Sequence, residues 1–328
     1  MPREAGNAAS KEEKTLVQLK TIQTEQRNPA TLDIDRADTA EILRLMNAED
    51  QKVASAVGEV LEQITKAVDL IYRQVHGGGR LVYCGCGTSG RLGVLDASEC
   101  PPTFGVEPGR VTGIIAGGPD ALTNAAEGAE DHFAAGEADL RAIGFGAKDA
   151  LVGIAASGRT PYVLGAMAYA RSLGAPVIGL TCCPGSEIDT AADVGIAPQP
   201  GPEVVTGSTR LKSGTAQKLV LNMLSTATMI KMGKVYSNLM VDVCASNQKL
   251  VARAVSIVRS ATQADEETAL CALRQADFSC KTAIVMLLCG VDAEKAHALL
   301  KGVDGHVSDA VRAVPGGEEA DRQARRIG

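Results

Sequence analysis

Short apolar runs alternate with helix-length amphipathic stretches through the middle of the chain. Five runs rich in Val, Ile, Leu and Ala have the length and composition of buried strands: 81–84, 111–116, 151–155, 177–181 and 194–197. Stretches with helical spacing follow each of the first three runs. This alternation is typical of a doubly wound parallel sheet, in which ligands bind beyond the carboxyl ends of the strands. The pattern therefore predicts an α/β fold with a five-stranded parallel sheet.

Helical patterns flank this region on both sides. Before it, 39–50 and 51–76 are predicted helices, and three glycines at 77–79 end the second. After it, we expect one long helix over 211–232 and short helices from residue 247 onward. The predicted organisation is an N-terminal leader with helices (1–70), an α/β domain (71–234), a helical C-terminal subdomain (247–315) and a frayed tail (316–328).

Composition and charge narrow the class of protein. With four Phe, five Tyr and no Trp, the core must be mainly aliphatic. The net charge is −6 without any run of Lys or Arg, so we expect no nucleic-acid partner. Because no stretch approaches about eighteen consecutive apolar residues and the N-terminus has no signal-peptide core, we expect a cytoplasmic protein without membrane contact. The nine Cys form no C-x-x-C pair and lie far from the four His, so we expect reduced thiols and no metal site.

A glycine-rich loop follows the first predicted strand. Residues 85–90 (GCGTSG) match the dinucleotide-binding pattern G-x-G-x-x-G. A dinucleotide site also needs an acidic residue after the second strand to hold the ribose, but that strand ends in Ala-Gly-Gly at 116–118. Dinucleotide binding is therefore the weaker interpretation of the loop.

A second hydroxyl-bearing turn, 156–160 (ASGRT), follows the third predicted strand. Each of the two turns offers backbone N–H groups at a helix N-terminus and Ser or Thr hydroxyls, which together suit a phosphate monoester. We expect the two turns to lie at neighbouring strand ends and to bind one phosphate. In the alternative interpretation, Ser157 and Thr160 only cap the following helix.

The two turns resemble those of the sugar isomerase (SIS) domain, a phosphosugar-binding module with a flavodoxin-like fold. Longer stretches are similar to the N-acetylmuramic acid 6-phosphate etherase family: 24–50, 85–104 (GCGTSGRLGVLDASECPPTF), 116–118, 127–131 (EGAED), 153–162 (GIAASGRTPY) and 203–218 (EVVTGSTRLKSGTAQK). One departure is Cys86, where the family usually has a small residue such as Ala. The resemblance implies a homodimer with the active site close to the subunit interface, and no metal or organic cofactor.

The resemblance also implies a reaction, the removal of the D-lactyl ether from N-acetylmuramic acid 6-phosphate in amino-sugar catabolism and cell-wall recycling. Such an ether resists direct displacement, but opening of the sugar ring makes the C2 proton acidic. Elimination of lactate from C3 and addition of water then give N-acetylglucosamine 6-phosphate. These steps need a base near C2 and an acid near the departing oxygen, each worth roughly 10²–10⁴ in rate.

Glu99 and Glu130 match the catalytic glutamates of the family, and which of them is the acid stays open. Glu99 precedes Cys-Pro-Pro at 100–102, which we expect to end a short helix near the rim of the phosphate site. We expect Glu127 and Glu130, three residues apart, to share one face of a helix, so position alone does not rank them. The expected substrate-binding residues are Thr88, Ser89, Arg91, Ser157, Gly158, Arg159, Thr160 and Ser208.

Four cations are candidates for binding the phosphate or the lactyl carboxylate, or alternatively for neutralising acidic neighbours: Arg91, Arg159, Arg210 and Lys212. Two other functions stay open at this point. The chain could be a phosphosugar sensor without turnover, as the related and larger glucokinase regulatory protein is. It could also be an aldose–ketose isomerase, which shares the abstraction of the C2 proton.

Overall fold

The computed structural model describes residues 23–243 and 248–325. The chain divides into two compact units. The first contains the residues up to Ala97 together with Val111–Leu224, and the second contains Ser98–Arg110 together with the residues from Ser225 onward. Only the first unit contains the five-stranded sheet.

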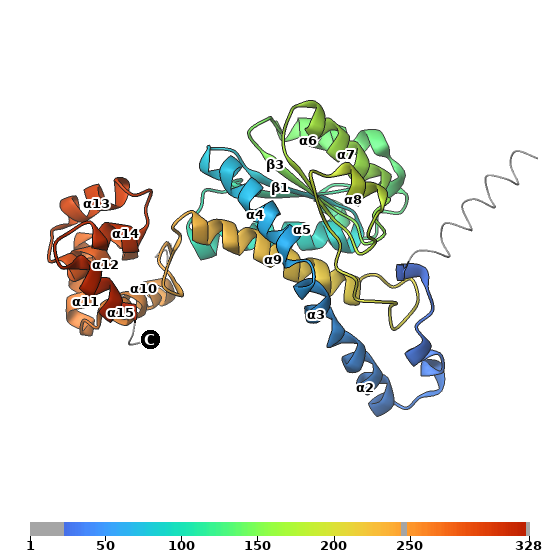
Figure 1. The fold of residues 1–328 in the computed structure, drawn as a ribbon, viewed down its shortest axis with the longest axis horizontal. Helices are drawn as coiled ribbons and strands as arrows, with labels where there is room; N and C mark the ends of the chain where they lie inside the picture. Colours follow the sequence, from blue (N-terminus) through green and yellow to red (C-terminus); the bar gives the residue numbers. More distant parts are fainter. Residues whose placement is uncertain (1–22, 244–247, 326–328) are drawn as a thin grey trace, which may run out of the picture. The chain divides into compact units, whose positions relative to one another are not determined.

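The sheet of the first unit is parallel throughout, with the strand order β2-β1-β3-β4-β5 (Figure 1). Its strands are β1 (Leu81–Gly85), β2 (Val111–Ile115), β3 (Ala150–Ile154), β4 (Val177–Leu180) and β5 (Val194–Ile196). The predicted doubly wound fold and its five strands are confirmed, with strand ends that agree to within one residue. In the register of the sheet, the last residue of β1 pairs with the last residues of both β2 and β3, so the carboxyl ends of these three strands meet at one edge.

Helices cover both faces of the sheet (Figure 1). The helices and 3-10 turns of the first unit are η1 (Gln23–Glu25), η2 (Pro29–Thr31), η3 (Ile34–Arg36), α2 (Thr39–Asp50), α3 (Lys52–Gly58), α4 (Leu61–His76), α5 (Gly87–Phe104), η4 (Pro119–Leu122), η5 (Ala129–Asp131), α6 (Phe133–Ala142), α7 (Pro161–Ser172), α8 (Glu187–Ala191) and α9 (Lys212–Lys231), of which α5 and α9 continue into the second unit. Successive side chains of a strand point to opposite faces. On β1, Val82 and Cys84 belong to the core cluster that contains Tyr162 of α7. Tyr83 donates from its hydroxyl to Asp96 of α5 at 2.8 Å on the other face.

The predicted helix over 51–76 is wrong in one respect, because the structure divides it into α3 and α4. Val60, with φ −112° and ψ 17°, leaves the helical conformation and precedes α4. Glycine is about 1 kcal/mol less favourable than alanine inside a helix, so Gly58 is a position where a break costs little. The apolar spacing continues across the break, which is why the pattern alone predicted one helix.

The second unit is helical except for a small hairpin, as predicted for the C-terminal part. Its elements are β6 (Val235–Tyr236), β7 (Leu239–Met240), α10 (Gln248–Thr262), α11 (Glu266–Gln275), α12 (Cys280–Cys289), α13 (Ala293–Lys301), α14 (Val307–Arg312) and α15 (Gly317–Arg325). The expectation of a frayed end from residue 316 is wrong, since α15 occupies this segment. Asp321 of α15 is only 1% exposed and accepts hydrogen bonds from the Tyr236 hydroxyl and the Arg312 guanidinium. These donors hold a very polar helix in place.

The sequence led to expectations about cysteines, metal sites and membrane contact. The cysteines at described positions are free thiols, as predicted, and Cys244 lies outside the described residues. Within 23–243 and 248–325, no three His, Cys, Asp or Glu side chains are grouped so that they could hold a metal ion. No helix in these ranges has the length and apolar character that crossing a membrane requires.

Candidate active site

The glycine-rich loop joins β1 to α5 in a tight turn. A Cβ atom on Gly85 would lie 2.8 Å from the Gly90 nitrogen, and one on Gly90 would lie 2.6 Å from the Gly85 oxygen. Both positions therefore need glycine. The first N–H groups of a helix have no partner within the helix, so the start of α5 presents backbone donors beside the half-buried Thr88 and the buried Ser89.

The second turn follows β3, which is the neighbour of β1 in the sheet, so the two turns lie at adjacent strand ends as predicted. Gly158 has φ +69°, and a Cβ atom there would lie 2.0 Å from Ser186 Oγ. Thr160 stands at the N-cap of α7, but its side chain makes no capping hydrogen bond. The helix-capping interpretation of this turn is therefore wrong for Thr160, and its hydroxyl is not used to cap α7.

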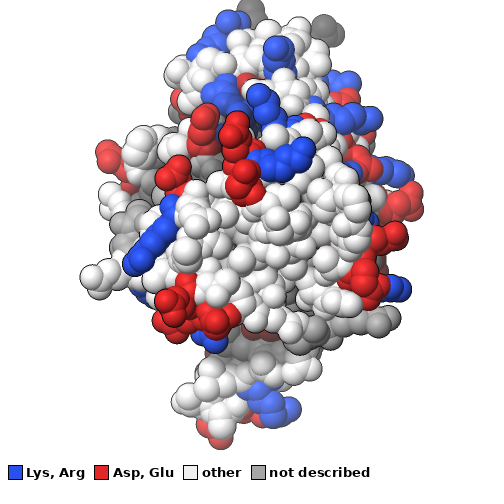
Figure 2. Space-filling model, turned by 90° about the vertical axis from the view of Figure 1, so that its left-hand side faces the viewer, with Lys and Arg blue, Asp and Glu red and all other residues white. Residues whose placement is uncertain are grey.

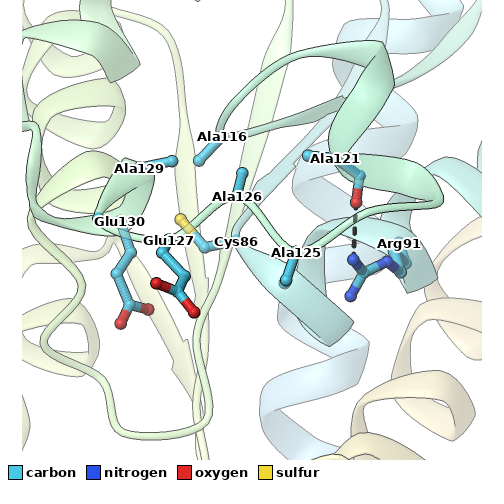
Figure 3. A pocket seen from close by; sticks show the side chains of 11 residues that line it. Cys86, Arg91, Ala116, Ala121, Ala125, Ala126, Glu127, Ala129 and Glu130 are labelled. Carbon is cyan, nitrogen blue, oxygen red and sulfur yellow. Dashed lines mark hydrogen bonds between the residues drawn. The ribbon is translucent and has the colours of Figure 1, made fainter.

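A cavity of about 320 Å³ opens beside the glycine-rich loop (Figure 3). It lies between that loop and the segment after β2, and its lining consists of Cys86, Gly87, Arg91, Ala116, Ala121, Ala125, Ala126, Glu127, Gly128, Ala129 and Glu130. The lining combines small alanines with two carboxylates, which lie side by side in Figure 3. The cavity therefore has room for a small ligand next to two acidic groups.

Glu127 and Glu130 do not share a helix face, contrary to the prediction. Glu127 lies in a turn, Gly128 follows with φ +73°, and Glu130 lies in the short η5. The left-handed conformation at Gly128 interrupts any helix between the two glutamates. Both side chains are exposed and reach the cavity from an irregular segment.

Arg91 lines this cavity and is hydrogen-bonded to the segment after β2. Its Nη2 donates to the Ala121 oxygen at 2.7 Å (Figure 3). Its Nε donates to the Leu122 oxygen and its Nη2 also donates to the Asn124 oxygen, each at 2.9 Å. These bonds tie α5 to the segment after β2. Arg91 lies at the predicted site, and the described contacts give it a structural role there.

Cys86 lines the same cavity as the two carboxylates. Burial, followed by the negative charges of Glu130 and then Asp131, raises the pKa of its thiol to about 12. The side chain therefore stays a neutral thiol at physiological pH. It behaves as a small apolar group, in keeping with the alanine that the resemblance leads one to expect there.

Glu99 lies near the carboxyl end of α5 and is exposed. The prediction that the prolines after it end the helix is wrong, because α5 continues to Phe104 with Pro101 and Pro102 inside it. Proline lacks an N–H donor but has a helical φ. The Gly105 N–H, which donates to the Pro101 oxygen at 2.9 Å, shows that the turn continues past both prolines. Glu99 is not among the residues lining the described cavity.

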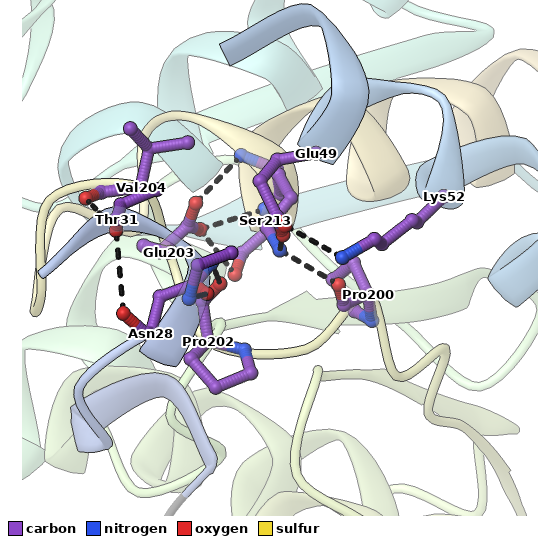
Figure 4. A network of polar contacts seen from close by, with 11 residues as sticks. Asn28, Thr31, Glu49, Lys52, Pro200, Pro202, Glu203, Val204 and Ser213 are labelled. Carbon is purple, nitrogen blue, oxygen red and sulfur yellow. Dashed lines mark hydrogen bonds and ion pairs between the residues drawn. The ribbon is translucent and has the colours of Figure 1, made fainter. Parts of the chain in front are cut away.

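A buried polar network fixes the start of α9 (Figure 4). The carboxylate of Glu203 accepts hydrogen bonds from the backbone nitrogens of Lys212 and Ser213 at 2.9 Å each. Lys212 Nζ is fully buried and donates to Glu49 Oε2 at 2.6 Å and to the Pro200 oxygen at 3.0 Å. Lys212 was predicted either to bind an anionic group of the ligand or to neutralise an acidic neighbour. The structure shows the second role, with Glu49 as the neighbour.

The hydroxyl-bearing turn before α9 contains the predicted residue Ser208, which is half-buried. Its backbone nitrogen donates to the Val205 oxygen at 3.0 Å, and its oxygen accepts from the Leu211 nitrogen at 3.2 Å. Among the other cation candidates, Arg159 is half-buried and Arg210 is exposed. None of these side chains lines the described cavity.

Sequence reasoning missed three buried polar residues that shape the site: Glu49, Glu203 and Gln217. Gln217 is 1% exposed and accepts a hydrogen bond from the Ser89 hydroxyl. A signal was present in the sequence, because Gln217 stands in line with Ser213, Val220 and Leu224 on the buried face of α9. A polar residue at such a position must find a partner inside the protein.

Comparisons with known proteins agree with this architecture. The family model of the SIS domain matches residues 134–227, and that of the glucokinase regulatory protein N-terminal SIS domain matches residues 63–171. The chain is 56% identical to N-acetylmuramic acid 6-phosphate etherase of Photorhabdus laumondii over 298 residues, which are 91% of this chain and 99% of the relative. The chain belongs to the N-acetylmuramic acid 6-phosphate etherase family.

Other members of this etherase family are equally similar. The N-acetylmuramic acid 6-phosphate etherase of Serratia proteamaculans is 57% identical over 293 residues, covering 89% of this chain and 99% of the relative. A solved structure of a putative phosphosugar isomerase from Bacteroides fragilis has a TM-score of 0.45 and 22% identity, covering 60% of this chain and 94% of that one.

Proposed function

We propose that this chain cleaves the D-lactyl ether of N-acetylmuramic acid 6-phosphate, with water, to N-acetylglucosamine 6-phosphate and D-lactate. The observation that carries the proposal is the 56% identity to a relative named for this activity, over 99% of that relative's length. A phosphosugar sensor without turnover and an aldose–ketose isomerase are not favoured, because relatives that are 56–57% identical to this chain carry the etherase name.

The proposed reaction begins with the open-chain sugar, whose C1 aldehyde acidifies the proton on C2. A glutamate removes this proton, the bond between C3 and the lactyl oxygen breaks, and a second glutamate protonates the departing oxygen. Lactate leaves behind a 2,3-unsaturated aldehyde. Water then adds at C3, and C2 takes a proton back. Glu130, which lines the cavity, and Glu99 are the proposed proton-transfer groups.

The two turns at the ends of β1 and β3 are the proposed phosphate site. The start of α5 supplies backbone N–H donors, and Ser157 and Thr160 supply hydroxyls from the adjacent strand end. We further assign phosphosugar binding to residues 71–234, place the protein in the cytoplasm and expect a homodimer. These assignments rest on the family resemblance.

One incubation tests the proposal. Purified protein with N-acetylmuramic acid 6-phosphate is expected to release D-lactate, and the same sugar without its phosphate is expected to be a poor substrate. If no D-lactate appears, the proposed function is wrong. If both sugars react equally well, the phosphate site is wrong.

Isotope labelling tests the route. In deuterated water, the product is expected to carry deuterium at C2, because a carboxylic acid that exchanges with solvent returns that proton. In oxygen-18 water, the new hydroxyl at C3 is expected to be labelled while the lactate keeps its bridging oxygen. A label in the lactate would show cleavage on the other side of the ether and would exclude the elimination.

A further inference from the structure

The side-chain amide of Gln217 is only half satisfied. Its Oε1 accepts a hydrogen bond from Ser89 Oγ at 2.9 Å. Its Nε2 is buried and has no hydrogen-bond partner among the residues that the structure describes. A buried donor without an acceptor costs free energy, and most buried polar groups in folded proteins are paired. An unpaired buried donor at a ligand site indicates that the ligand itself supplies the acceptor.

This amide lies beside the start of α5. Ser89, its partner, belongs to the first turn of that helix. One turn earlier on α9, a Cβ atom on Gly214 would lie 3.4 Å from Thr88 Cγ2. The opening turns of the two helices therefore lie against each other, and the amide of Gln217 reaches the first turn of α5, whose backbone N–H groups suit an anion.

The hydrogen bond to Gln217 changes the part that Ser89 can play. A hydroxyl has one hydrogen to donate, and here Ser89 gives it to Gln217 Oε1. In this arrangement the Ser89 oxygen can only accept a further hydrogen bond. A phosphate dianion has no hydrogen to donate to it. The donor next to it is the amide of Gln217.

Two cations near this point are engaged elsewhere. Lys212 is fully buried against Glu49, and Arg91 donates to three backbone oxygens. Neither is free to bind an anion at the start of α5, so neutral donors there contribute to its binding. Each neutral donor contributes appreciably to binding, because a hydrogen bond to a charged group is stronger than one between neutral groups.

We propose that Gln217 is a phosphate-binding residue: its Nε2 donates a hydrogen bond to the phosphate held at the start of α5, while its Oε1 keeps Ser89 in place. The proposal rests on the proposed function for the identity of the ligand as a 6-phosphosugar. It gives α9 a direct part in recognising the phosphate, beside the two turns that the sequence indicates.

Two substitutions separate phosphate binding from a purely structural role. Gln217→Met keeps the length of the side chain and removes both hydrogen bonds. Gln217→Glu keeps an acceptor for Ser89, removes the donor and adds a negative charge next to the phosphate. Gln63→Met is the matched control, since Gln63 also has a buried side-chain atom without a partner, its Oε1, but belongs to α4 and not to α9.

Calorimetric titration with N-acetylglucosamine 6-phosphate measures the effect. We expect Gln217→Met to weaken binding roughly 10- to 100-fold, as for loss of a hydrogen bond to a charged group, and Gln217→Glu to weaken it further. Gln63→Met is expected to bind like the wild type. The opposite order, with Gln217→Glu near the wild type and Gln217→Met weakened, would show that Gln217 only positions Ser89 and would overturn the proposal. Wild-type binding by both variants would also overturn it.

Two further readouts keep the outcome clear. The thermal unfolding temperature without ligand is expected to change little for Gln217→Met, because the variant also removes an unpaired buried donor. If Gln217→Glu does not fold, Gln217→Met alone decides the test.

In lactate-release assays, Gln217→Met is expected to raise KM more than it lowers kcat. A wild-type protein that binds the phosphosugar but releases no lactate would refute the proposed function and leave the role of Gln217 intact. An active Gln217→Met enzyme with the KM of the wild type would refute the proposed role of Gln217 and leave the proposed function intact.

Discussion

The acidic side chains singled out above fall into two groups that differ in burial. Glu99, Glu127 and Glu130 are exposed to solvent. Glu49 and Glu203 are 3% and 0% exposed and are hydrogen-bonded to α9 or its lysine. Exposed carboxylates can meet a substrate and exchange protons with solvent, whereas the buried pair can only hold the scaffold.

Replacement of single glutamates tests this division. Glu99→Gln and Glu130→Gln are each expected to lower kcat for lactate release by roughly 10²–10⁴, because each removes a proton-transfer group. Both variants are expected to unfold at the wild-type temperature, since both positions are exposed. Glu127→Gln is the control on the same segment and is expected to be milder. A wild-type rate for either of the first two variants would remove that residue from the mechanism.

At the scale of elements, α2 is tied to α9 by one buried ion pair between Glu49 and Lys212. Burial alone would raise the pKa of Glu49, but hydrogen bonds from Lys212, Lys52 and Asn28 outweigh it and lower the pKa to about 2. A carboxyl group with a lowered pKa stabilises the folded state fully above its ordinary pKa, and this stabilisation is lost as the pH falls towards the lowered value.

The Glu49→Gln variant is therefore expected to be less stable than the wild type by about 3–5 kcal/mol at pH 7, as for a broken buried pair. The difference is expected to shrink as the pH falls from 4.5 towards 2, the interval between the two pKa values of Glu49. Urea unfolding at several pH values measures it. Glu62→Gln is the control, because the pair between Glu62 and Lys66 lies on the surface. A difference that did not depend on pH would contradict the assignment.

In the second unit, the position of α15 depends on Asp321. Its carboxylate is 1% exposed and accepts hydrogen bonds from Tyr236, Arg312 and Arg325. Burial, then the charge of Asp321 and its hydrogen bond, raise the pKa of Tyr236, so this phenol stays a donor at physiological pH.

Loss of this charge is expected to destabilise the second unit. Asp321→Asn is expected to cost roughly 3 kcal/mol, because two arginines lose their shared partner. Glu319→Gln, which removes an exposed pair with Arg322 on the same helix, is expected to cost less than about 1 kcal/mol. Denaturant unfolding of the full chain compares the two. Equal effects would mean that α15 does not depend on Asp321.

At the scale of the whole molecule, charge is mixed. The chain carries 33 Lys and Arg against 39 Asp and Glu. On the face drawn in Figure 2, basic and acidic side chains are interspersed among the described residues, around an area of uncharged side chains. This face offers no field of positive charge, and we expect an anionic ligand to be bound by local donors at helix starts.

Assembly is the prediction at this scale. We expect light scattering to give twice the mass of one chain, as the family resemblance implies. The measurement is made over a range of protein concentrations, and the mass of a single chain throughout would contradict the prediction.

The sequence by itself determined the layers of the fold and indicated where a candidate site lies. Hydrophobic periodicity and turn residues are local properties, so the five strands, the long helix over Lys212–Lys231 and the two glycine-containing turns could be read in order along the chain. The same reading failed where local signals mislead. Pro101 and Pro102 suggested a helix end, and the segment from residue 316 was expected to be a frayed tail, whereas α15 forms there.

Only the tertiary structure decided which polar groups face each other. Ser89 meets Gln217 across 128 residues, and Glu49 meets Lys212 across 163. No local pattern encodes such a pairing, because it depends on how α2, α5 and α9 pack on the sheet. Burial then makes each pairing obligatory, since a polar group removed from water must find a partner. Gln217 Nε2, a donor that finds no partner among the described residues, is for that reason visible only in the folded protein.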